Sequence, residues 1–338
     1  MNSEDVKVIK ALLSKPKRIV IVPHKNPDGD AIGSSLGLWY YLKLIGQEAR
    51  VIVPNDYPRF LKFLPGTPEV LNFERDNAAA MEYLNSSDLC FTLDFNQLGR
   101  VGQMTPILEG LGATFIMIDH HQAPDSYAKI TYSDTKMSST AEMIYNFISS
   151  LGDANKITSE IAECLYAGIV TDTGSFKYSS TSSKTHQVAA DLIDKGANSF
   201  EVQNKIFDTN TPDRLKLLSC ALKNMVILKN YNTAYMSLSQ AELDAHNYKK
   251  GDTEGFVNYG LTLQDIRFAV IFIENKEEGI IKISFRSEGE FSVNEFARNH
   301  FHGGGHTNAA GGKSDNNMEE TVKHFEALLE NYKEQLTR

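Results

Sequence analysis

The chain has 338 residues, of which 41% are hydrophobic, and this length excludes a single ordinary core but suits two domains. A net charge of −9 argues against a protein that tracks long nucleic acid, because that mode needs a basic face that neutralises many phosphates. The N-terminal residues lack an apolar signal-like run and no later run reaches the ~18 apolar residues of a membrane span, so we expect a cytoplasmic protein without a membrane partner.

The first half of the chain repeats one arrangement: a short apolar run, then a polar residue, then a helical pattern. This predicts a doubly wound α/β domain with a parallel sheet, its strands at 18–23, 50–54, 89–94 and 114–119. Open sheets of this kind bind ligands in the crevice beyond the carboxyl ends of their strands. His24, Asp94 and Asp119 stand at such ends and should converge there.

The segment after the first predicted strand places one imidazole and two carboxylates within seven residues: His24, Asp28 and Asp30. Pro27 and Gly29 favour a tight turn, so the two carboxylates can face different ions. Asn-Pro-Asp-Gly is also an ordinary turn sequence. This segment therefore supports metal binding only in combination with further candidate ligands elsewhere in the chain.

Further candidate ligands follow three later elements. Asp119, His120 and His121 end an apolar strand, Asp94 ends the strand before it, and Asp172 follows a predicted helix that Thr158 caps. Two divalent cations carry a charge of +4, and four carboxylates, those of Asp28, Asp30, Asp94 and Asp172, would balance it. Carboxylates and imidazoles without thiolate suit Mn²⁺, Fe²⁺ or Co²⁺ better than a structural Zn²⁺, and two such ions can clamp an in-line displacement at phosphorus.

The middle of the chain carries structural signals. Ser139 to Glu142 has the spacing of a capping box that begins a helix reaching Ile148, and we assign this motif no chemistry. Residues 1–185 are predicted to form the first domain, and 186–212 a helical linker. In the second domain, residues 213–338, alternating strands form hairpins at 225–238 and 266–286, and the last helix spans 318–336. A smaller α/β domain is expected.

A second polar cluster lies in that smaller domain. Gly303, Gly304 and Gly305 precede His306, and three consecutive glycines free the backbone to turn several N–H groups toward one anion. A glycine-rich loop is more often only a flexible connection. Arg286 and Ser287, at the end of a predicted strand, add a candidate bidentate phosphate clamp.

In this order and spacing, these residues resemble the DHH/DHHA1 phosphoesterases, most closely their nanoRNase and pAp phosphatase branch, over nearly the whole chain. The resemblance implies that His24, Asp28 and Asp94 bind one metal ion and that Asp30, Asp94, His120 and Asp172 bind the other, both ions being Mn²⁺. It also implies that Asp119 orients His120 and that His121 contacts the scissile phosphate or protonates the leaving oxygen. Arg286, Ser287 and the glycine–His306 loop would hold the rest of the substrate.

The expected activity is hydrolysis of short oligoribonucleotides such as pApA to mononucleotides, together with 3′-dephosphorylation of pAp. One alternative keeps the chemistry and changes the substrate to cyclic di-AMP. The other is of a different class: a nucleotide-binding regulator whose metals only hold the ligand. The polarity of attack and the formation of a homodimer stay open.

Overall fold

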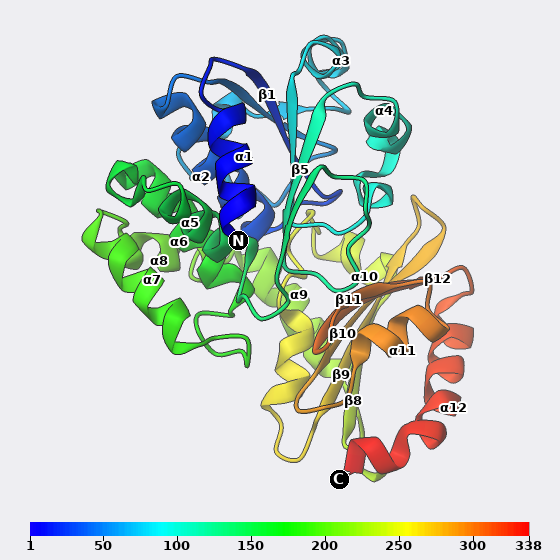
Figure 1. Ribbon diagram of the computed structural model, residues 1–338. Coiled ribbons are helices and arrows are strands. Elements are labelled where there is room, and N and C mark those ends of the chain that lie inside the picture. The colour runs from blue at the N-terminus through cyan, green and yellow to red at the C-terminus, as the bar shows by residue number, and fades with distance from the viewer. Residues whose placement is uncertain (338) are drawn as a thin grey trace. The chain divides into compact units, whose positions relative to one another are not determined.

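The computed structural model describes residues 1–337 and divides into two compact units, Met1–Thr209 and a second unit that begins at Asn210 (Figure 1). Each unit has its own sheet and its own core. The predicted fold class, a doubly wound parallel-sheet domain followed by a smaller α/β domain, is confirmed. Within the described residues, no helix combines the length and apolar composition needed to cross a membrane.

The sheet of the first unit has six strands, all parallel, in the order β3-β2-β1-β4-β5-β6. The strands are β1 (Arg18–Pro23), β2 (Glu48–Val53), β3 (Leu71–Asn72), β4 (Leu89–Leu93), β5 (Thr114–Asp119) and β6 (Ile130–Ser133). The sequence predicted four of them. It missed β3, which has only two residues, and β6, whose alternating pattern lacks the continuous apolar run of a central strand.

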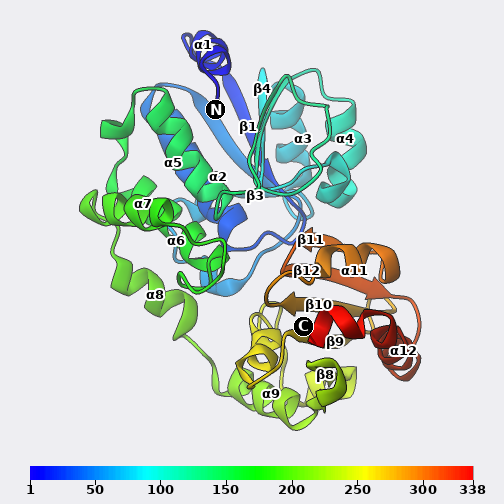
Figure 2. The same cartoon turned by 60° about the horizontal axis from the view of Figure 1, so that its bottom comes forward.

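Helices cover both faces of this sheet (Figure 2). Alternate residues of β1 point to opposite faces, so Ile19 and Ile21 pack in the core beneath α2, α5 and α6, whereas Val20 and Val22 pack in the core beneath α3 and α4. The helices of this unit are α1 (Ser3–Leu12), α2 (Gly29–Leu44), α3 (Asn77–Asn85), α4 (Thr105–Glu109), α5 (Thr140–Ser150), α6 (Ser159–Asp172), α7 (Ser183–Asp194) and α8 (Ser199–Phe207).

The strand order reverses between β1 and β4. From β1 the chain moves outward to β2 and β3, then returns to β4 on the other side of β1 and moves outward again through β5 and β6. At such a switch point neighbouring connections leave in opposite directions and open a crevice beyond the strand ends. His24 follows β1 and Asp94 follows β4, so both lie beside this crevice.

The predicted linker, 186–212, differs from the structure. It contains most of α7, all of α8 and the first residue of α9, and its residues through Thr209 belong to the first unit. Val188, Leu192 and Val202 lie in the core of that unit, where they pack with residues of α6. Amphipathic periodicity indicated helices correctly, but it does not say which surface an apolar stripe covers.

The second unit contains a mixed six-stranded sheet in the order β11-β12-β10-β9-β8-β7. Its strands are β7 (Val226–Leu228), β8 (Thr233–Leu238), β9 (Phe268–Asn275), β10 (Ile280–Ser287), β11 (Gly304–His306) and β12 (Ala309–Ser314). Both predicted hairpins are present, as the antiparallel pairs β7–β8 and β9–β10. Helices α11 (Val293–His300) and α12 (Met318–Thr337) pack on one face, and α9 (Pro212–Lys223) and α10 (Gln240–Ala245) on the other.

Candidate metal centre

The loop between β1 and α2 is fixed by hydrogen bonds to two other loops. Asn26 adopts a left-handed conformation (φ 56°), and its N–H donates to Asn55 Oδ1 at 2.7 Å. Asn55 Nδ2 donates in return to Asn26 Oδ1 at 2.8 Å. The N–H of Lys25 donates to the carbonyl of Arg100 at 2.8 Å. The loop is therefore held rigidly between the ends of β1, β2 and β4.

This loop delivers two carboxylates at the start of α2. Asp28 is the N-cap, and its Oδ1 accepts the N–H of Ala31 at 3.0 Å, which leaves Oδ2 facing His24. Asp30 lies in the first turn and is 1% exposed. Its two oxygens accept the N–H groups of Thr140 and Ala141 at 2.6 and 2.8 Å. The N-terminus of α5 thus stabilises the charge on Asp30.

The side chains of His24, Asp28 and Asp94 form a first group of candidate ligands. His24 Nε2 lies 3.8 Å from Asp28 Oδ2 and 3.5 Å from Asp94 Oδ2. These separations are too long for good hydrogen bonds. They suit ligand atoms around one ion, because two atoms each about 2.1 Å from a cation stand about 3 to 4 Å apart over the usual range of ligand angles.

Asp30, His120 and Asp172 form a second group. His120 Nε2 lies 3.8 Å from Asp30 Oδ2 and 3.5 Å from Asp172 Oδ2. It also lies 3.5 Å from Asp94 Oδ1. The two oxygens of Asp94 therefore face different groups, Oδ2 the first and Oδ1 the second.

Asp94 occupies an unusual backbone conformation. Its φ is +64°, in the left-handed region that aspartate tolerates better than most residues, and its N–H donates to the carbonyl of Ile118 at 3.1 Å. The side chain is 3% exposed. The turn that ends β4 thus directs this carboxylate between His24 and His120.

Asp119 contacts a different histidine from the one predicted. Its Oδ1 lies 2.7 Å from Nδ1 of His121, whereas Nδ1 of His120 lies 3.1 Å from the carbonyl of Met137. The prediction that Asp119 orients His120 was wrong, because consecutive residues after a strand point in different directions and only one of them can face a given carboxylate. His120 is held by a backbone carbonyl instead.

The donor set and its charge fit two divalent cations. The carboxylates of Asp28, Asp30, Asp94 and Asp172 could balance a charge of +4, two imidazoles complete the groups, and neither group contains a thiolate. Such oxygen and nitrogen ligands suit Mn²⁺ and related ions. The chemical nature and spacing of the residues therefore agree with the predicted cofactor class.

The pKa values of two buried carboxylates also agree with a site for cations. Burial first, and then the charges of Asp94 and Asp172, raise the pKa of Asp30 well above its ordinary value. Burial, which outweighs the favourable charge of His120, also raises the pKa of Asp172 to about 7. A raised pKa means that these two carboxylates lose their protons less readily, and a cation that binds beside them would displace those protons.

Metal removal should lower the thermal stability of the protein. Mn²⁺ at about 100 times its dissociation constant should stabilise the fold by about 2.7 kcal/mol per site relative to EDTA. At one fixed Mn²⁺ concentration the gain should be larger at pH 8 than at pH 6, because below about pH 7 Asp172 carries a proton that the cation must displace. Thermal unfolding with Mn²⁺ or EDTA at both pH values measures this. An equal midpoint with and without Mn²⁺ would contradict it.

In the second unit, the predicted phosphate clamp lies at the end of β10. Arg286 is half-buried and its Nη1 donates to the carbonyl of Phe285 at 2.9 Å. Ser287 is 5% exposed, and its hydroxyl donates to the carbonyl of Phe291 at 2.7 Å and accepts from Asn308 Nδ2 at 2.9 Å. The Ser287 hydroxyl already holds the following turn, so of this pair Arg286 is the better candidate for a phosphate contact.

Two of the three glycines before His306 use their amides for bonds within the second unit. The N–H of Gly303 donates to the carbonyl of Ala297 at 3.1 Å, and that of Gly305 to Asn294 Oδ1 at 2.9 Å. A Cβ at Gly303 would collide with the carbonyl of Gly311 on β12. These two amides are not free to bind an anion, and the absence of side chains lets β11 approach β12 and present His306 at the edge of the sheet.

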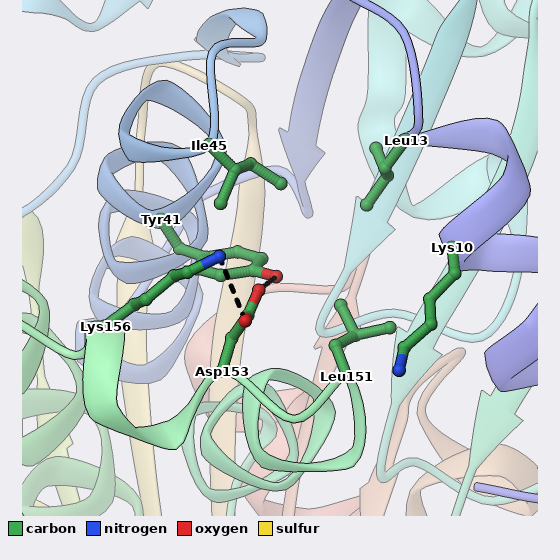
Figure 3. Close-up of a pocket in the computed structure, with 7 residues that line it drawn as sticks. All are labelled: Lys10, Leu13, Tyr41, Ile45, Leu151, Asp153 and Lys156. Carbon is green, nitrogen blue, oxygen red and sulfur yellow. Dashed lines mark hydrogen bonds and ion pairs between the residues drawn. The ribbon is translucent and has the colours of Figure 1, made fainter.

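A cavity of about 250 Å³ lies at the C-terminal end of helix α2, whereas the metal centre lies at its N-terminal end (Figure 3). Three of its four polar side chains pair with one another: Tyr41 donates its hydroxyl proton to Asp153 at 2.8 Å, and Lys156 lies 3.0 Å from the same carboxylate. The α-helix rises about 1.5 Å per residue, so Tyr41 is about 16 Å along α2 from Asp30. This cavity is separate from the metal centre and we assign it no role.

Comparison with known proteins places both units in described families. Residues 18–169 match the family model described as the DHH family, N-terminal domain, and residues 230–336 match the DHHA1 domain. The first match contains five of the six candidate ligands and the second contains Arg286 and the glycine–His306 loop. Asp172 lies three residues beyond the first match.

Three proteins that are similar to this chain carry different descriptions. The chain is 31% identical to the bifunctional oligoribonuclease and PAP phosphatase NrnA of Thermus thermophilus, over 95% of this chain and 90% of that one. It is 26% identical to the cyclic-di-AMP phosphodiesterase GdpP of Bacillus subtilis, over 96% of this chain and 49% of that one. A crystal structure of an exopolyphosphatase-related protein from Bacteroides fragilis has 39% identity and a TM-score of 0.95, covering 100% of this chain and 98% of that one.

Proposed function

Because this chain belongs to the DHH/DHHA1 family of phosphoesterases, we propose that it is a two-metal hydrolase of short oligoribonucleotides such as pApA, and that it also removes the 3′-phosphate of pAp. The products would be mononucleotides. The names of the relatives at about 30% identity support this substrate class. The acidic net charge agrees with a small substrate and with the absence of a long nucleic-acid partner. We expect the reaction to take place in the cytoplasm.

The observation that carries the proposal is the position of Asp94 between two groups of ligands. Oδ2 lies 3.5 Å from His24 Nε2, and Oδ1 lies 3.5 Å from His120 Nε2. A carboxylate that faces both groups can bridge two cations at a short separation. When bound, two such cations would activate a water for attack and neutralise the charge that develops in an in-line displacement at phosphorus. We propose Mn²⁺ as the metal because the ligands are carboxylates and imidazoles.

The residues around the centre would have distinct tasks. His24 and Asp28 would hold one cation, and Asp30, His120 and Asp172 the other, with Asp94 shared. His121 would contact the scissile phosphate or give a proton to the leaving oxygen. Its Nδ1 lies 2.7 Å from Asp119 Oδ1, and this contact fixes the orientation of the ring. Asp119 therefore acts through His121.

In the second unit we propose that Arg286 and His306 hold the remainder of the substrate. Arg286 presents a guanidinium at the end of β10, and His306 stands on β11. Two of the three glycine amides are bonded internally, so the glycines would contribute the shape of the loop rather than N–H donors. Ser287 would support the turn beside Arg286.

Cyclic di-AMP hydrolysis is the second candidate, and the match to GdpP favours it. The same two-metal chemistry would open a cyclic dinucleotide. That match has the lower identity, and this chain covers about half of that relative. A regulator that binds a nucleotide without turnover agrees less well with the full set of four aspartates and with His121 beside them.

A substrate panel tests the proposal. Release of mononucleotide should be followed from 5′-labelled pApA and from a 20-nucleotide RNA, with pAp and cyclic di-AMP in parallel, each with Mn²⁺ or with EDTA. We expect rapid Mn²⁺-dependent cleavage of pApA and pAp and slow cleavage of the long RNA. If cyclic di-AMP is cleaved faster than pApA and pAp, cyclic di-AMP becomes the proposed substrate in their place. If the Mn²⁺-loaded protein turns over none of these compounds, the proposal that it is a hydrolase of nucleotides is refuted.

A further inference from the structure

The segment Met137–Ala141, between β6 and the first turn of α5, contacts three of the six candidate ligands. Its Met137 carbonyl lies 3.1 Å from His120 Nδ1. Its Thr140 and Ala141 amides donate to the oxygens of Asp30. The hydroxyl of Thr140 donates to Asp94 Oδ1 at 3.0 Å. The sequence had indicated only a helix start here.

The hydroxyl of Thr140 is not required to begin the helix. Ser139 is the N-cap, and its Oγ accepts the N–H of Glu142 at 3.0 Å. Thr140 is the next residue, with no exposed surface. A threonine inside a helix often donates to a carbonyl of the preceding turn, but at the first helical position none is within reach, and this hydroxyl bonds to Asp94.

The contact fixes the one part of Asp94 that the backbone leaves free. The main chain of Asp94 is held by the bond from its N–H to Ile118, but its carboxylate can still rotate. Thr140 bonds to Oδ1, the oxygen that faces His120, so Oδ2 stays directed to His24. A rotated carboxylate would no longer offer one oxygen to each group.

The segment itself is tied to a neighbouring helix. The carboxylate of Glu142 accepts from both the N–H and the hydroxyl of Ser138, and from the Thr185 hydroxyl at 3.0 Å. Glu142 is 1% exposed. Thr185 lies in the first turn of α7, so α7 supports the position from which Thr140 reaches Asp94.

We propose that Thr140 is a positioning residue of the two-metal centre, whose hydroxyl holds Asp94 in the one orientation that serves both cations. This inference rests on the proposed function, since it assumes that Asp94 bridges two ions. Partners that orient metal ligands commonly contribute 10- to 100-fold, as an order of magnitude, to metal affinity or activity. Thr140 does not touch the substrate or the reacting atoms in this account.

Two substitutions at this position separate the hydroxyl from the shape of the side chain. Thr140→Val removes the hydroxyl and keeps the branched shape and the amide that donates to Asp30. Thr140→Ser keeps the hydroxyl. Calorimetric titration of metal-stripped protein with Mn²⁺ should show binding weakened by roughly 10- to 100-fold in Thr140→Val and mostly retained in Thr140→Ser. Phosphoesterase activity of Thr140→Val should return at higher Mn²⁺.

Thr233→Val is the matched control, because it removes an equally buried threonine hydroxyl, which donates to the carbonyl of Tyr231 at 2.8 Å in the second unit and touches no candidate ligand. It should lower the unfolding midpoint in EDTA and leave Mn²⁺ affinity near that of the wild type. If Thr140→Val does not fold, Thr140→Ala takes its place. Wild-type affinity in the variant without a hydroxyl, or equal losses in Thr140→Ser or Thr233→Val, would overturn the inference. If the wild type itself binds no Mn²⁺, the proposed function fails instead.

Discussion

Asp94→Asn is expected to reduce turnover of pApA by at least about a thousand-fold, which corresponds to about 4 kcal/mol of transition-state stabilisation. Asparagine keeps the size of the side chain and an oxygen for the Thr140 hydroxyl, but it loses the negative charge that both ligand groups share. Two cations would no longer be held at a short separation by one carboxylate. Initial rates at saturating substrate, over a range of Mn²⁺, measure the effect.

Asp134→Asn is the control for this substitution. Asp134 also follows a strand of the same sheet, but its Oδ1 accepts the N–H of Lys136 at 3.0 Å and it belongs to neither ligand group. Its replacement should leave turnover near the wild-type value. Turnover within tenfold of wild type in Asp94→Asn would mean that the shared carboxylate is not central, and the two-metal account would fail. An enzyme loses turnover at this position, whereas a regulator that only binds would lose affinity.

His121→Asn should separate catalysis from metal binding. The asparagine amide can still reach Asp119, but nothing replaces Nε2, so proton donation to the leaving oxygen is lost. A general acid typically contributes about 10²- to 10⁴-fold, and kcat should fall by that range. Calorimetry should still record Mn²⁺ binding at both sites, since His121 belongs to neither of the two ligand groups.

His186→Asn gives the matching histidine control. His186 is exposed and stacks on Phe176 with ring centroids 5.1 Å apart, outside the metal centre. It should change kcat little. If His121→Asn instead loses one Mn²⁺ ion, then His121 is a ligand and the assigned role as proton donor is incorrect.

Much of the first unit could be predicted because its signals are local. Apolar runs that end in His or Asp indicated β1, β4 and β5, and the geometry of parallel sheets requires their carboxyl ends to meet at one edge. Together with the family resemblance, this was enough to gather all six candidate ligand side chains. Strand β3 has two residues and leaves no periodic signal.

The details that escaped prediction depend on backbone direction and on packing partners. Asp119 meets His121 rather than His120 because of the turn after β5, which residue types do not specify. The Ser139–Glu142 motif was recognised as a helix start, but only the fold shows that Thr140 then faces Asp94. Likewise, the glycines before His306 signalled backbone freedom without showing that β12 uses that freedom.

The most direct test of the two-metal account is a titration of metal-stripped protein with Mn²⁺ in which bound ions and pApA hydrolysis are measured on the same samples. The account predicts two ions per chain at saturation, hydrolysis that rises as the second ion binds, and none in EDTA. Saturation at a single ion with full activity, or hydrolysis that persists in EDTA, would contradict it.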